Sequence, residues 1–168
     1  MPDLQSLSDI AEYHRDAESS LKLLFSRANP DFAVRFATYL SAEIDGELVE
    51  RISETDLRSS LVTLARIEVA IRSDYRARSK AKWSDNVSIA FRKIHKKYQE
   101  RARLDDILNV WSVNLLPQDR IVISQLKGFF KFRHWLAHGR ETNFAPVHAF
   151  QDVYLLANAV VTKLPLQS

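Results

Sequence analysis

The chain has 168 residues, a length typical of one domain, and a formal net charge of +3. It contains only three Gly and five Pro, which favours helices joined by short connections. The lack of Cys excludes disulfides and thiolate metal ligands and fits a reducing compartment. The first residues lack the pattern of a secretory signal, and no apolar run reaches eighteen residues. We therefore expect a cytoplasmic protein that has no contact with membranes.

Charge is distributed unevenly along the chain. Residues 1–57 carry five Lys/Arg against twelve Asp/Glu, a net charge of −7, whereas residues 58–103 carry thirteen against four, a net charge of +9. The basic segment is suited to a polyanion such as RNA, although Lys and Arg also solvate the faces of ordinary helices. The candidate RNA contacts are Arg92, Lys93, Lys96 and Lys97, with Trp83 and Tyr98 nearby to stack on bases.

Apolar periodicity predicts an all-α fold, a bundle of about five to seven helices in a single domain over 1–168. We divide it into acidic N-terminal helices over 1–56 and a core over 57–164. In the first half the expected helices cover 8–28, 30–40, 47–52 and 55–82, with Ser8 and Thr55 as N-caps and a turn at Asp45-Gly46. In the second half they cover 86–103, 104–113, 121–136 and 144–164, with Asp85 as an N-cap.

Two charged side chains interrupt apolar stripes on different predicted helices. Glu68 lies on a stripe that steps by four and three residues, and Arg133 does the same on the late helix. A carboxylate and a guanidinium that each replace an apolar residue are natural partners, because either would be costly to bury alone. The alternative is that Glu68 reaches water at a helix edge. The first stripe is Leu57, Leu61, Leu64, Glu68, Ile71 and Tyr75, and the second is Val122, Leu126, Phe129, Arg133 and Leu136.

A basic stripe runs along the same late helix as Arg133. Lys127, Lys131, His134 and His138 step by four, three and four residues, and Gly139 suits a helix end. An arginine keeps its charge while an imidazole titrates near neutral pH, so the pair Arg133 and His138 is suited to phosphate chemistry. The simpler interpretation is a basic last turn that complements the helix dipole.

The stretch Arg133-His134-Trp135-Leu136-Ala137-His138-Gly139 resembles the Arg-x(4)-His signature of the HEPN superfamily. These are small all-α domains, many of them RNases of toxin–antitoxin, phage-defence and RNA-processing systems. The resemblance covers about 57–164 and implies a metal-independent endoribonuclease that works as a homodimer with its two motifs facing one cleft. The 2′-hydroxyl of RNA would attack the adjacent phosphate and leave a cyclic phosphate. The resemblance implies His138 as general acid or base and Arg133 as the phosphate ligand. The candidate supporting cations are His134, Lys127, Lys131 and Arg140, and Glu68 is a candidate for orienting Arg133.

Two alternative functions stay open, and two absences are expected. A non-catalytic HEPN domain would serve as an RNA-binding or dimerisation module of a larger complex. A toxin held by an antitoxin or another defence-system partner protein is also possible, but HEPN toxins modified by a nucleotidyltransferase generally carry Tyr two residues after the motif His, where this chain has Arg140. We expect no cofactor and no metal, because His134 and His138 lack further ligands in a known pattern and no Gly-rich phosphate loop is present.

Overall fold

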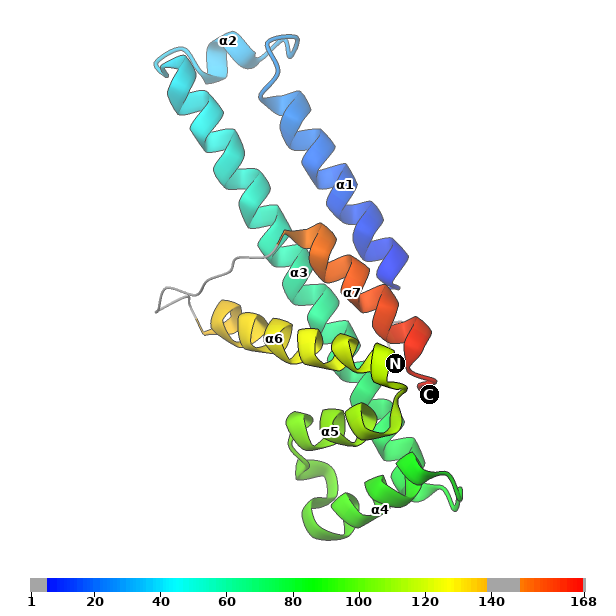
Figure 1. Ribbon diagram of the computed structural model, residues 1–168. Coiled ribbons are helices and arrows are strands. Elements are labelled where there is room, and N and C mark those ends of the chain that lie inside the picture. Colours follow the sequence, from blue (N-terminus) through cyan, green and yellow to red (C-terminus); the bar gives the residue numbers. More distant parts are fainter. Residues whose placement is uncertain (1–5, 139–148, 168) are drawn as a thin grey trace.

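The computed structural model describes residues 6–138 and 149–167, and within them every regular element is helical, which confirms the predicted all-α fold. A few residues of 3₁₀ helix, Gln99–Arg101 and Pro117–Asp119, join some of the helices. The α-helices are α1 Leu7–Leu24, α2 Phe32–Arg35, α3 Ser41–Lys80, α4 Asn86–Tyr98, α5 Leu104–Asn114, α6 Arg120–Ala137 and α7 Phe150–Lys163 (Figure 1).

Helix α3 is a single helix of 40 residues around which the other elements are arranged. The predicted turn at Asp45-Gly46 and the separate helices over 47–52 and 55–82 are therefore wrong. Gly46 lies inside the helix, where it costs about 0.5–1 kcal/mol relative to Ala, and the surrounding Glu, Leu and Arg residues favour helix. Thr55 is not an N-cap, since its hydroxyl donates a hydrogen bond to the Arg51 carbonyl 2.9 Å away within the helix.

The N-terminal elements also differ from the prediction. Ser6, two residues before the predicted cap, begins α1: its hydroxyl accepts from the Asp9 N–H at 3.1 Å, and the Asp9 carboxylate accepts from the Ser6 N–H at 3.0 Å. This reciprocal pair is a capping box. The helix then ends at Leu24, and the predicted helix over 30–40 shortens to the four residues of α2. Phe36 of the predicted helix instead packs with Phe25 and Ile44, and the three side chains are buried together between the end of α1 and the start of α3.

The C-terminal half follows the prediction more closely. Asp85 is the N-cap of α4 as predicted, because its carboxylate accepts from the Ser88 N–H at 3.0 Å. The helix ends at Tyr98 and not at 103, since Gln99 adopts a φ of 51°, which an α-helix does not accommodate. Helices α5 and α6 end within one residue of their predicted bounds. Helix α7 begins at Phe150, and the part of its predicted span before Ala149 lies outside the described residues.

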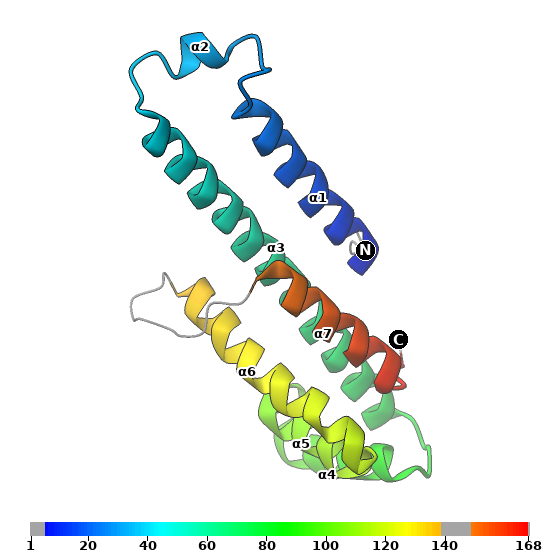
Figure 2. The same ribbon diagram turned by 45° about the horizontal axis from the view of Figure 1, so that its top comes forward.

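The molecule consists of an arm and a body that share α3. In both views α1 and the first half of α3 form an antiparallel hairpin that extends away from α4, α5 and α6 (Figures 1 and 2). The body has the main core, in which α3 to α7 bury residues such as Phe91, Leu108, Leu126 and Val160. The predicted division at 56/57 falls within α3, so the acidic helices and the core are joined by continuous helix. Among the described helices, none has both the length and the apolar composition needed to cross a membrane.

A buried ionic cluster fixes the far end of the body. Arg78 is one of the cations of the basic segment 58–103, but its side chain is buried, with 6% exposure. Its Nε donates to the Asp74 carboxylate at 2.7 Å, and its Nη2 donates to the Pro165 carbonyl at 2.7 Å. Its Nη1 lies 3.2 Å from the Asp85 carboxylate, and the rings of two tryptophans pack near the guanidinium. The cluster therefore ties the C-terminal residues to α3 and to the start of α4.

Candidate phosphate-binding site

The predicted contact between Glu68 and Arg133 is present. Arg133 Nη1 lies 2.8 Å from Glu68 Oε2 and so joins α6 to the middle of α3. The Glu68 side chain is 16% exposed and the Arg133 side chain 34% exposed, so the pair is partly buried at an edge that solvent reaches. The two apolar stripes that contain Glu68 and Arg133 pack against each other. This packing brings the two charged side chains within reach, as the sequence predicted.

A second guanidinium shares the Glu68 carboxylate. Arg72 Nε donates to Glu68 Oε1 at 2.8 Å, and Arg72 Nη1 donates to the Ala102 carbonyl at 3.2 Å. Sequence reasoning missed Arg72, although its position four residues after Glu68 on a helix was a usable signal. Two arginines thus meet one carboxylate, and the cluster has an excess of one positive charge.

Part of the hydrogen-bonding capacity of this cluster is unused. Within the described residues neither Glu68 Oε2 nor Arg133 Nε has a hydrogen-bond partner, although both atoms are buried. The contact between the two side chains is therefore mainly Coulombic. Because the Arg133 side chain is 34% exposed and the cluster carries an uncompensated positive charge, the solvent-facing part of the guanidinium is suited to an anion such as a phosphate.

The predicted basic stripe of α6 faces solvent for most of its length. Lys131, His134 and His138 are exposed, while Lys127 is half-buried and its Nζ donates to Asn109 Oδ1 at 2.6 Å. The imidazole rings of His134 and His138 lie 4.1 Å apart between centroids. The last turn of the helix therefore presents two titratable groups side by side.

Arg133 and His138 point in different directions. They are five positions apart, and 3.6 residues per turn places them about 140° apart around the helix axis. This agrees with their environments, because Arg133 turns toward α3 while His138 is exposed. Within one chain the structure brings Arg133 together with Glu68 and His134 together with His138, but it does not bring Arg133 and His138 to one point.

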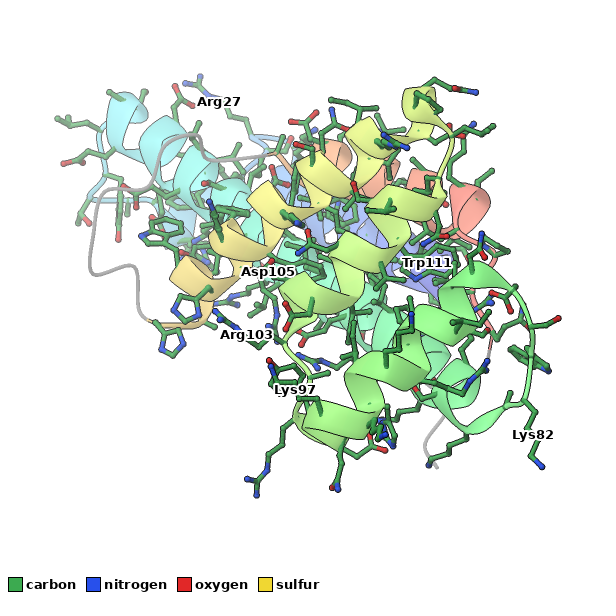
Figure 3. The ribbon with its side chains drawn as sticks, turned by 60° about the horizontal axis from the view of Figure 1, so that its bottom comes forward. Arg27, Lys82, Lys97, Arg103, Asp105 and Trp111 are labelled. Carbon is green, nitrogen blue, oxygen red and sulfur yellow. The ribbon has the colours of Figure 1, made fainter. Side chains whose placement is uncertain are left out.

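The predicted RNA contacts on α4 are of two kinds. Lys93, Lys96 and Lys97 are exposed, but Arg92 Nη1 donates to the Ala81 carbonyl at 2.9 Å and so supports the end of α3. Figure 3 shows Lys97 and Arg103 on the side of the molecule where α6 ends. The bond from Arg72 to the Ala102 carbonyl links this basic segment directly to the Glu68 cluster.

Arg140, a predicted supporting residue, lies outside the described residues. In the described part of the chain no group of three or more His, Cys, Asp or Glu side chains is placed to hold a metal ion. Comparison with family models, curated proteins and solved structures finds no match. The functional argument therefore rests on the motif and on the geometry of the site.

Proposed function

We propose that this protein is a metal-independent endoribonuclease of the HEPN type, with a composite active site in the cleft of a homodimer. The observation that carries the proposal is the cluster in which Glu68 holds both Arg133 and Arg72. Oriented cations of this kind stabilise the charge that develops on a phosphate during cleavage. The resemblance of 133–139 to the HEPN motif supplies the reaction class.

In the proposed reaction the ribose 2′-hydroxyl attacks the neighbouring phosphorus, and the bond to the 5′-oxygen of the next nucleotide breaks. His138 moves the proton of the attacking or the leaving oxygen, and Arg133 binds the phosphate oxygens. The products are a 2′,3′-cyclic phosphate and a free 5′-hydroxyl, so the step needs neither a metal nor an oxidant.

The divergent directions of Arg133 and His138 support a shared cleft. One helix places the two side chains about 140° apart, whereas two copies of α6 that face each other can combine the arginine of one with the histidine of the other. A closed pair related by a twofold axis would contain two such combinations. His134, Lys131 and Lys127 would line the approach to it.

The exposed lysines of α4 support RNA as the substrate. They belong to the basic segment that the bond from Arg72 to the Ala102 carbonyl joins to the Glu68 cluster. Phosphate neutralisation by such lysines makes binding strongly dependent on salt. By resemblance, the biological setting we propose is phage defence or a toxin–antitoxin system, with an antitoxin or another defence protein as a further partner.

The test is an RNase assay in the presence of EDTA. We expect the wild-type chain to cleave RNA and to leave cyclic phosphate ends, and we expect His138→Ala to lower the rate by about 10²–10⁴-fold, the usual contribution of general acid–base catalysis. Gln125→Ala, an exposed residue of the same helix, is the matched control and should keep the wild-type rate.

Two outcomes would contradict the proposal. Cleavage that stops in EDTA would show that a metal is required. RNA binding without cleavage, equal in the wild type and in His138→Ala, would favour the second candidate, a non-catalytic RNA-binding module. The solvent exposure of His138 is the observation that keeps this second candidate open.

A further inference from the structure

The arm carries an excess of acidic side chains that the rest of the chain does not neutralise. Residues 7–57, the acidic arm, contain five Lys/Arg and eleven Asp/Glu, a net charge of −6. Some of these charges are paired locally, as in Lys22 with Glu18 at 2.7 Å. Exposed carboxylates with no ion pair among the described residues include Glu12, Asp16, Asp45 and Glu50.

A groove between α1 and α3 shows the same excess at close range. It is lined by Leu21 and by Glu47, Glu50 and Glu54, together with two arginines. Both arginines are already paired, Arg51 with Glu47 and Arg58 with Glu54. Within the described part of the chain, Glu50 is therefore the uncompensated charge of this groove.

The arm also exposes large apolar side chains. Exposed apolar side chains beside charged residues can add contact area to a protein–protein interface. Their exposed fractions are 72% for Tyr13, 73% for Leu23, 83% for Val34, 70% for Leu40 and 66% for Val49.

The complementary surface is on the body of the same chain. The basic patch consists of five exposed cations on the last turns of α4, on the 3₁₀ helix after it and at the start of α5: Lys93, Lys96, Lys97, Arg101 and Arg103. None of them lies within salt-bridge distance of a carboxylate among the residues that the structure describes. Tyr98, which is 42% exposed, adds an apolar surface to the patch.

The part of the arm around Glu50 and the basic patch lie far apart within one molecule. Glu50 and Arg76 are separated by 26 residues of continuous helix, which is about 39 Å at 1.5 Å per residue. Arg76 Nε bonds Glu100 at 2.8 Å, which places the basic patch near that level of α3. The arm is also held at its base, where His14 bonds Asp56 at 2.6 Å. Since the Debye length is only about 8–10 Å in physiological salt, the opposite charges act on other molecules.

We propose that the acidic arm of one molecule binds the basic patch of a second copy of this chain. Because each copy carries both surfaces, two copies in opposite directions form two such contacts and close as a twofold pair. Complementary charge steers the two copies together, and the exposed apolar residues of the arm and Tyr98 supply contact area. This contact uses surfaces other than the α6 pair proposed above and does not depend on ribonuclease activity, although RNA bound to the basic patch would compete with it.

The experiment measures the mass of the full chain by sedimentation at several concentrations, in roughly 50 mM and roughly 300 mM salt. One variant reverses the arm with Glu12→Lys, Asp16→Lys and Glu50→Lys, and another reverses the patch with Lys93→Glu, Lys96→Glu and Lys97→Glu. All six positions are exposed on helices, and circular dichroism checks that each variant is folded. We expect each variant alone to raise the dissociation constant of self-association at low salt by about tenfold or more.

The decisive measurements use combinations of variants in which the arm and the patch again have opposite charges. An equimolar mixture of the two variants should associate again, because each then offers the charge that the other lacks. The chain with all six substitutions, which has the net charge of the wild type, should also self-associate. Self-association that either reversal leaves unchanged, or that the mixture does not restore, would overturn the proposal. None of these readouts uses RNA, so failure here leaves the proposed ribonuclease untouched.

Discussion

Two of the places where arginine meets carboxylate, the Arg78 cluster and the Arg133 cluster, differ in burial and in charge balance. The Arg78 cluster has one arginine for two carboxylates, and its three side-chain nitrogens all have partners. The Arg133 cluster has two arginines for one carboxylate, and Arg133 Nε has no hydrogen-bond partner in the described residues. Asp74 is fully buried, whereas the Arg133 side chain remains 34% exposed.

From this difference we infer a structural role for the Arg78 cluster and propose a binding role for the Arg133 cluster. When all donors are occupied and solvent is excluded, an arginine has no group left for a ligand, and its role is to connect parts of the fold. When positive charge is in excess and the arginine side chain stays partly exposed, an anion can complete the cluster. Mutations that weaken the two clusters should therefore affect different properties of the protein.

The largest expected effect is the loss of stability in Asp74→Ala. Removal of this carboxylate leaves Arg78 buried with only the more exposed Asp85 as an acidic partner, and breaking a buried pair costs about 3–5 kcal/mol. Urea unfolding measures the loss. Burial raises the pKa of the Asp74 carboxyl, against hydrogen bonds from the Gln167 N–H and from Arg78, so the ionised form is itself disfavoured. Asp74→Asn, which keeps an acceptor, should therefore be the milder variant, and equal losses in both would contradict this account.

Substitution of Glu68 or Arg133 should cost less stability than Asp74→Ala but should lower the cleavage rate more. A double-mutant cycle with Glu68→Ala and Arg133→Ala should give a coupling free energy of about 0.5–3 kcal/mol, toward the lower end because a third of the arginine is exposed. Arg133→Ala should lower cleavage by about 10²–10³-fold, the usual effect of removing one group that stabilises the transition state. Glu68→Gln should keep more stability than Glu68→Ala, because its amide oxygen still accepts a hydrogen bond.

Unfolding free energies and single-turnover cleavage rates of the four chains provide the measurement. Stability changes that add within about 0.3–0.5 kcal/mol would show that the two side chains are not coupled in solution. Arg66→Ala, on α3 two residues before Glu68, is a control that should change neither quantity by a comparable amount.

The sequence was sufficient for the helical class and for the Glu68–Arg133 contact, because both depend on periodicity that the core enforces. It was insufficient where local signals compete with tertiary packing. Gly46 suggested a turn, but α3 continues through it. Arg78 was counted with the basic segment 58–103, although α4 and the C-terminal residues enclose it. Arg72 was overlooked since its bond to Ala102 depends on a segment 30 residues away. The catalytic role of the motif stays a prediction.

The smallest expected effect concerns Asp85, which belongs to the structural cluster but lies at its exposed edge. Burial acts to raise the pKa of the Asp85 carboxyl, but hydrogen bonds from the Ser88 side chain and N–H and the charge of Arg78 lower it overall. The folded-state pKa of Asp85 lies below its unfolded value of about 3.9. The charge of Asp85 therefore stabilises the fold at pH values above the unfolded pKa, and this contribution is lost as the pH falls through the folded-state pKa.

Asp85→Ala should lose about 1 kcal/mol of unfolding free energy at pH 7, a typical loss for an N-cap. Asp85→Asn keeps the N-cap hydrogen bond but not the charge. The difference in unfolding free energy between Asp85→Asn and the wild type should therefore shrink as the pH falls below the unfolded pKa. Urea unfolding at a series of acidic pH values measures that difference, and a constant offset between Asp85→Asn and the wild type would show that the Asp85 charge does not contribute.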